Sequence, residues 1–160
     1  MQQRVHFSQK LDELRMLVLR MAALAETAAR NAARAYLTGD SDLAEEVIMG
    51  DVDINAMEDK IDAFTLELLA LDQPMACDLR SIIGAMRMSV NLERVGDEAV
   101  NLAHRALFLS TRPPMPSNPR MEQLAGQVLE MLARAVRAYA DKDTDLAGQI
   151  CAMDHTADEL

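Results

Sequence analysis

The stretch that decides the fold is SDLAEEVIMGDVDINAMEDKIDAFTLELLAL, which runs from Ser41 to Leu71. Its apolar residues recur every seven positions in two columns, the pattern of a helix that packs lengthwise against other helices. The columns are Val47, Ile54, Ile61 and Leu68, and Leu43, Gly50, Met57, Phe64 and Leu71. At 1.5 Å per residue, such a helix is roughly 45 Å long. The sequence therefore predicts a bundle of long helices.

Breaks in the pattern divide the rest of the chain. Gly39 can end one helix, with Ser41 or Asp42 as the cap of the next. Asp72 can cap a further helix, because the proline that follows at position 74 is tolerated in a first turn. Four of the five prolines fall in residues 110–119, which cannot be helical. The predicted helices span about 8–38, 42–71, 74–109, 120–141 and 143–160.

Composition supports an all-α protein and excludes several functions. Of the 160 residues 50% are hydrophobic, but only 3% are aromatic and none is tryptophan, which favours helices over sheets. A net charge of −10 argues against nucleic acid as a partner. Cys77 and Cys151 are far apart and are expected to be reduced thiols. With no signal peptide and no apolar run long enough to cross a bilayer, we expect a cytoplasmic protein that at most contacts a membrane peripherally.

An internal repeat predicts two related units. ARAYLTGDSDLA at residues 33–44 matches VRAYADKDTDLA at residues 136–147, with Tyr36 and Tyr139 103 positions apart. We expect tandem three-helix bundles: a first repeat over 1–109, a proline-rich linker over 110–119, and an incomplete second repeat over 120–160. An uncovered apolar face around Leu124, Val128 and Leu132 then predicts self-association or poor order after Pro119.

The stretch LERVGDEAVN, Leu92 to Asn101, places polar groups where apolar ones are expected. Glu93, Asp97 and Asn101 lie four residues apart and share one face of a helix. Glu93 and Asp97 interrupt two heptad columns that we assign to the core. The columns are Leu79, Met86, Glu93, Val100 and Leu107, and Ile83, Val90, Asp97 and His104. A carboxylate at such a seam or its edge requires a basic partner, a raised pKa or a bound cation.

The preceding helix offers matching groups. Asp51 and Glu58 lie next to its apolar seam, and Asn55 and Asp62 flank the other side. Carboxylates from two packed helices form an oxygen-rich cage of the kind that Mg²⁺, Mn²⁺ or Fe would use. The alternative is that these residues face water or pair with basic side chains, as carboxylates at bundle edges commonly do.

Several stretches together resemble the PhoU family of phosphate-transport regulators. They are QPMACDLRSIIGAMRMSVNLERVGDEAVNLA (73–103), DVDINAMEDKI (51–61) and the duplicated Asp-x-Asp-Leu-Ala. The resemblance implies tandem three-helix bundles with metal-binding E/D-x-x-x-D motifs. Glu93 and Asp97 match one motif, with Asn101 one turn on. Asp51 and Asn55 match the other, although Asn55 replaces a carboxylate and weakens a metal cage.

The resemblance also implies a function. Such a protein is a cytoplasmic, non-enzymatic negative regulator of phosphate uptake and of the phosphate-starvation response. It contacts the phosphate ABC transporter and a sensor histidine kinase, and is expected to form a homodimer or other homo-oligomer. A helical adaptor without metal is the main alternative. A di-iron enzyme is disfavoured because it would use Glu-x-x-His twice, and no histidine here has glutamate three residues before it.

Overall fold

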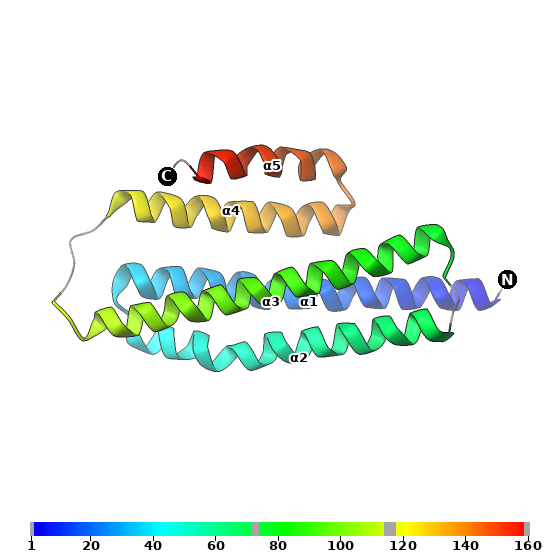
Figure 1. Ribbon diagram of the computed structural model, residues 1–160, viewed down its shortest axis with the longest axis horizontal. Helices are drawn as coiled ribbons and strands as arrows, with labels where there is room; N and C mark the ends of the chain where they lie inside the picture. Colours follow the sequence, from blue (N-terminus) through cyan, green and yellow to red (C-terminus); the bar gives the residue numbers. More distant parts are fainter. Residues whose placement is uncertain (1, 72–73, 114–117, 159–160) are drawn as a thin grey trace.

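The computed structural model describes residues 2–71, 74–113 and 118–158, and all its elements are helices. The helices are α1 (Gln2–Thr38), α2 (Ser41–Leu71), α3 (Ala76–Ser110), α4 (Pro119–Asp141) and α5 (Thr144–Asp158) (Figure 1). The described residues contain no strand, which confirms the all-α prediction. Asp72, the predicted cap, and residues 114–117 of the proline-rich linker lie outside the described part. None of the described helices is long and apolar enough to span a bilayer.

The first three helices form a bundle with a core of aliphatic side chains. Leu14, Met21, Ile54, Ile61 and Leu92 are among the buried residues of this core. A second cluster, at the end where α1 meets α2, is built mainly from alanines. Such small side chains allow close helix approach, as the shrinking residues towards the end of α1 predict. The predicted column Val47, Ile54, Ile61 and Leu68 is entirely buried, so the seam of α2 is confirmed.

The predicted core columns of α3 are wrong by about one residue. Leu79, Ile83 and Val90 are exposed. The buried residues of α3 are instead Ile82, Ala85, Ser89, Leu92, Gly96, Ala99, Ala103 and Ala106. Most of these are small, so the hydrophobic pattern was stronger on the neighbouring, exposed columns. Glu93 is half-buried and Asp97 is exposed, which places both at the edge of the bundle.

The duplicated Asp-x-Asp-Leu-Ala motif is a helix cap. Asp40 Oδ1 accepts a hydrogen bond of 3.0 Å from the backbone N–H of Leu43, and Asp143 Oδ1 accepts one of 2.9 Å from Leu146. Asp40 therefore caps α2, and the predicted caps Ser41 and Asp42 do not. Gly39 ends α1 with a φ of 71°, a conformation that glycine adopts without steric cost.

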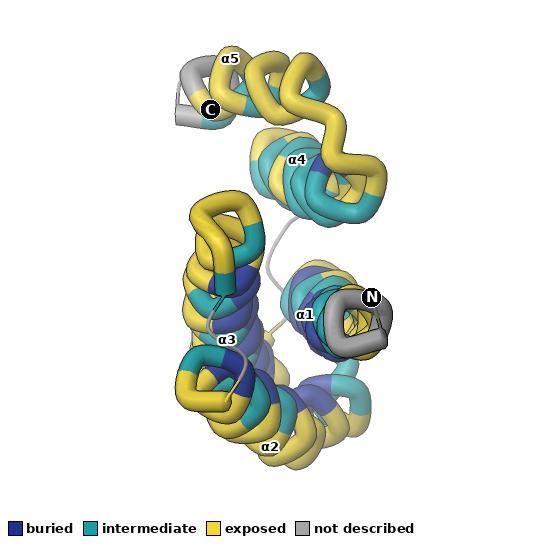
Figure 2. The backbone as a smooth tube through the Cα atoms, turned by 90° about the vertical axis from the view of Figure 1, so that its right-hand side faces the viewer, coloured by how far each residue is buried: buried dark blue, intermediate teal, exposed yellow. Residues whose placement is uncertain are grey.

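The α4–α5 hairpin lies on the first bundle, with α4 against α1 and α5 on the far side of α4 (Figure 2). Leu132, Val136 and Tyr139 of α4 pack against the core of the first bundle. The prediction that Leu132 is uncovered is therefore wrong, because α1 covers it. Val128 is exposed, as predicted. Among the residues of α5 whose exposure the structure describes, none is fully buried.

We expect the protein to self-associate through the α4–α5 hairpin. Because none of the α5 residues with a described exposure is fully buried, this helix gains little from packing, and short helices are marginal in water without it. Light scattering should give a mass of at least twice 17.7 kDa, and Val128→Ser should lower it. A monomer at all concentrations tested would contradict this expectation.

Candidate functional site

The candidate site lies where α2 and α3 approach each other at Gly96. A Cβ atom added to Gly96 would lie 3.0 Å from Ile54 Cδ1 and 3.4 Å from Asp51 Oδ1. Real Cβ atoms rarely tolerate contacts this short, so a side chain at position 96 would have to displace its neighbours. Gly96 therefore permits the close approach that brings α3 against Asp51.

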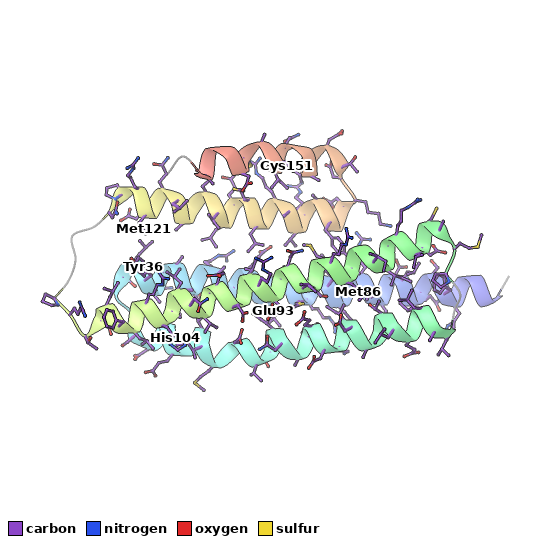
Figure 3. The ribbon with its side chains drawn as sticks, viewed as in Figure 1. Tyr36, Met86, Glu93, His104, Met121 and Cys151 are labelled. Atoms are coloured by element: carbon purple, nitrogen blue, oxygen red, sulfur yellow. The ribbon has the colours of Figure 1, made fainter. Side chains whose placement is uncertain are left out.

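Four carboxylates from the two helices, Asp51, Glu58, Glu93 and Asp97, form what we call the carboxylate cluster. In α2, Asp51 and Glu58 fall in the heptad column that begins with buried Ala44 and ends with buried Thr65. The sequence predicts that carboxylates interrupt inner columns of α3. In the structure, the inner column that carboxylates interrupt belongs to α2. Figure 3 shows Glu93 on the part of α3 that runs alongside α2.

The pKa values of the two glutamates in the cluster are raised. Burial is the largest cause of the raised pKa of Glu58, followed by the negative charge of Glu93. Burial also raises the pKa of Glu93, followed by the charges of Asp97 and Asp51 and by a side-chain hydrogen bond with Asp97, while Arg94 opposes the shift. The cluster is therefore short of positive charge.

Only one of the two carboxylate oxygens of Asp51 has a hydrogen-bond partner. The Asn55 amide donates a 2.9 Å hydrogen bond from Nδ2 to Asp51 Oδ2. The other oxygen, Oδ1, is buried and has no hydrogen-bond partner, and Asp62 Oδ1 is in the same condition. An unsatisfied buried acceptor costs about 1–3 kcal/mol. Asp51 Oδ1 would be stabilised by any donor or cation brought to the cluster.

The remaining predicted site residue, Asn101, is exposed, and its Nδ2 lies 3.5 Å from Glu98 Oε2. This contact directs its amide to Glu98, whereas the prediction groups Asn101 with Asp97. Glu58, by contrast, belongs to the cluster although it is not part of either E/D-x-x-x-D motif. The signal that identifies it is the seven-residue column that it shares with Ala44, Asp51 and Thr65.

The cluster has the chemistry of a hard-cation site but not the assembled geometry. Carboxylate and amide oxygens are the ligands that Mg²⁺, Mn²⁺ and Fe ions accept. Yet among the described residues no three His, Cys, Asp or Glu side chains are arranged to hold a metal ion. Asn55 directs N–H groups, which cannot bind a cation, towards Asp51. Side chains would have to rearrange before a cation could bind.

The raised pKa values predict a pH-dependent stability. For both glutamates the folded-state pKa exceeds the ordinary value of 4.5, so the folded state binds the proton more tightly than the unfolded chain does. The contribution of this tighter proton binding to the free energy of unfolding is fully present below pH 4.5. It is lost as the pH rises through the folded-state pKa. In Glu58→Gln with Glu93→Gln, the free energy of unfolding should exceed that of wild type increasingly as the pH rises above 4.5.

Urea unfolding at several pH values between about 4 and 7 measures this difference. The control carries Glu45→Gln and Glu46→Gln, at exposed positions of α2. Parallel pH profiles for wild type, the control and the test variant would refute the assigned charge repulsion.

Known proteins with similar sequences cover almost the whole chain. The model of the PhoU domain family matches residues 18–106 and 121–160. The phosphate-specific transport system accessory protein PhoU homolog of Aquifex aeolicus is 38% identical over 151 residues, covering 94% of this chain and 68% of that protein. PhoU of Escherichia coli is 33% identical over 153 residues, covering 96% and 64%. The chain thus spans about two thirds of the length of these relatives.

Solved structures match the fold. The crystal structure of PhoU from Pseudomonas aeruginosa superposes with a TM-score of 0.93 at 36% identity, covering 96% of this chain and 74% of that one. The phosphate transport system regulatory protein PhoU from Streptococcus pneumoniae gives 0.89 at 29% identity, covering 96% and 72%.

Proposed function

Because this chain belongs to the PhoU family, we propose that it is a negative regulator of phosphate uptake and of the phosphate-starvation response. It acts in the cytoplasm through contacts with the phosphate ABC transporter and its sensor histidine kinase. The relatives named as accessory proteins of phosphate-specific transport support this role. Those names describe accessory proteins, so we propose a non-enzymatic mechanism in which the helical surface binds and restrains its partners.

The carboxylate cluster is the single observation that best supports a contact role. It combines mutual charge repulsion with a buried oxygen of Asp51 that has no partner. Both features lower the stability of the isolated protein, so fold stability does not explain their presence. A site that needs positive charge from outside is suited to binding a cation or a basic partner.

A bound divalent or iron-type cation is the second part of the proposal. Asp51, Asn55, Glu93, Asp97 and Asn101 are the residues that would hold it, and the ion would supply the missing positive charge. Mass spectrometry of the purified protein tests for such an ion, with Glu93→Gln and Asp97→Asn as the variant that should lose it. A metal-free protein that still regulates phosphate uptake would favour the alternative, a helical adaptor without metal.

Regulation is tested in bacteria that carry the transporter and the kinase. Deleting the gene should switch on a phosphate-starvation reporter in phosphate-rich medium, and expressing the chain should switch it off again. The transporter and the kinase should co-purify with the tagged chain. A reporter that responds to phosphate normally in the deletion strain would refute the proposed function.

A further inference from the structure

The side of α2 that faces away from the bundle carries a second apolar seam. From position 45 to position 70 it advances in alternating steps of four and three residues, the heptad pattern of a helix that packs lengthwise against another helix. Met49, Val52 and Leu66 are 77%, 66% and 61% exposed, and the alanines of the seam are exposed as well. We call this surface the outer seam. Its apolar members are Met49, Val52, Ala56, Ala63, Leu66 and Ala70.

The packing of the first bundle does not use the outer seam. α2 contacts α1 and α3 through the buried column that contains Ile54 and Ile61. Figure 2 shows the opposite side of α2 exposed and turned away from the other helices. Val52 follows Asp51 by one residue, which places it about 100° around the helix from the carboxylate cluster. The outer seam is therefore separate from both the core and the proposed cation site, and an exposed apolar row of this kind is typical of an interaction surface.

Two carboxylates occupy positions of the outer seam. Glu45 and Asp59 stand where the heptad pattern otherwise places apolar residues, and both are exposed. Within residues 2–71, 74–113 and 118–158, neither forms an ion pair with a lysine or arginine. At 1.5 Å per residue they are about 21 Å apart along the helix, too far to share a cation. Each is thus a separate point of negative charge in an apolar row.

We propose that the outer seam binds a helix of a partner protein whose own apolar row is interrupted by lysine or arginine. The apolar side chains of the two helices would interdigitate, and the basic residues would pair with Glu45 and Asp59. The three alanines leave room for the side chains of the partner helix. The partner contact assigned here rests on the proposed function, which requires a protein partner but does not specify its chemistry.

Charge determines which occupant fits the outer seam. α2 contains nine acidic residues and one lysine. A two-fold contact between the seams of two copies would therefore set two strongly acidic helices against each other, since such a contact repeats the same patch. An anionic membrane surface attracts basic segments, so it is disfavoured for the same reason. A helix with basic residues brings the opposite charge, and the two pairs would also fix its register.

The probe is a fluorescent helical peptide of about 25 residues, which matches the length of the outer seam at 1.5 Å per residue. It carries leucines and alanines on one face, with lysines spaced to meet Glu45 and Asp59. One matched peptide replaces the lysines with glutamates, and another replaces the leucines with serines. In about 0.15 M salt, where surface charges are screened beyond roughly 8 Å, fluorescence anisotropy with the full chain should detect binding of the first peptide alone. Equal binding of the serine peptide would reduce the interaction to bulk charge attraction and overturn the proposal.

Variants of the apolar members locate the binding surface. Met49→Ser with Val52→Ser should weaken binding of the leucine–lysine peptide about tenfold or more, as loss of central interface contacts does. The matched control, Met16→Ser with Leu24→Ser, removes two exposed apolar residues of α1 and should bind the peptide as wild type does. Unchanged affinity in the Met49→Ser, Val52→Ser variant would contradict the inference.

A charge exchange separates the outer seam from the carboxylate cluster. Glu45→Lys with Asp59→Lys changes the seam and leaves all four carboxylates of the cluster in place. The variant should bind the glutamate peptide more tightly than the lysine peptide, which reverses the preference of wild type. An unchanged preference would mean that the lysine peptide binds another acidic surface, and the proposal would fail.

Two further measurements address the other occupants. Light scattering of the Met49→Ser, Val52→Ser variant should give the same mass as wild type. A lower mass would show that a second copy covers the outer seam. Phosphatidylserine vesicles should bind the protein more weakly than the leucine–lysine peptide does, and the reverse order would identify a membrane as the occupant. Either of these results would overturn the proposal.

The reporter assay distinguishes failure at the outer seam from failure of the proposed function. If deleting the gene has no effect on the phosphate-starvation reporter, the proposed function fails whatever the peptide does. If deletion activates the reporter but the folded Met49→Ser, Val52→Ser variant represses it as wild type does, the outer seam is not the partner contact and the regulatory role stands. Circular dichroism melting verifies that the variant is folded.

Discussion

Replacing Gly96 with valine should destabilise the protein by about 2–3 kcal/mol, the cost of forcing extra atoms into a packed contact. The new Cβ would lie 3.0 Å from Ile54 Cδ1 and 3.4 Å from Asp51 Oδ1, and the valine methyl groups would extend further. Because the contact joins α2 to α3, relieving it requires the side chains of Ile54 and Asp51, or α2 as a whole, to move away from α3. The same movement would disturb the carboxylate cluster.

Gly50→Val is the matched control. Gly50 is an exposed residue of α2, and no atom lies within 4 Å of the position that its Cβ would occupy. The same substitution there should be neutral or slightly stabilising, because glycine is the poorer helix former. Chemical unfolding of both variants measures the difference. Similar stabilities for the two would show that α2 and α3 are not tightly packed at Gly96.

The second large effect is expected from Glu93→Leu with Asp97→Leu. This variant removes a like-charge pair four residues apart and replaces Asp97 with a better helix former, which together should stabilise the protein by about 1 kcal/mol. Regulation of the phosphate-starvation reporter should fall to the level of the deletion strain. The opposite directions of the two effects would distinguish a functional site from a structural one.

Glu46→Leu serves as the control, since Glu46 is exposed on α2. It should change stability by no more than about 0.5 kcal/mol, as surface substitutions usually do, and it should leave regulation intact. Loss of stability in the double variant together with normal regulation would mean that Glu93 and Asp97 support the fold.

Sequence periodicity predicts the helices well and the packed face of α3 poorly. The aliphatic column through Ile54 and Ile61 identifies the seam of α2 because large side chains occupy the core there. In α3 the buried positions include Ser89 and Gly96, while larger residues such as Val90 lie outside. Close packing selects small residues, which carry little hydrophobic signal, so the pattern points to the wrong columns.

The candidate site, too, is predicted only in part by the sequence. Heptad spacing is sufficient to predict that Asp51 and Glu93 come together across two helices, and the charge of Asp51 is accordingly among the causes that raise the pKa of Glu93. Heptad spacing does not predict which side chains form hydrogen bonds. The amide of Asn55 donates to Asp51, and that of Asn101 donates to Glu98. The position of α4 on α1 also depends on tertiary packing that periodicity does not specify.

The central claim is that the carboxylate cluster is retained for regulation at some cost to stability. The measurement that tests it most directly is the phosphate-starvation reporter in phosphate-rich medium, in cells whose only copy of the gene carries Glu93→Leu and Asp97→Leu. The account predicts a fully active reporter, with a variant protein that is present at the wild-type level and melts at a higher temperature. A repressed reporter with the same protein level would contradict it.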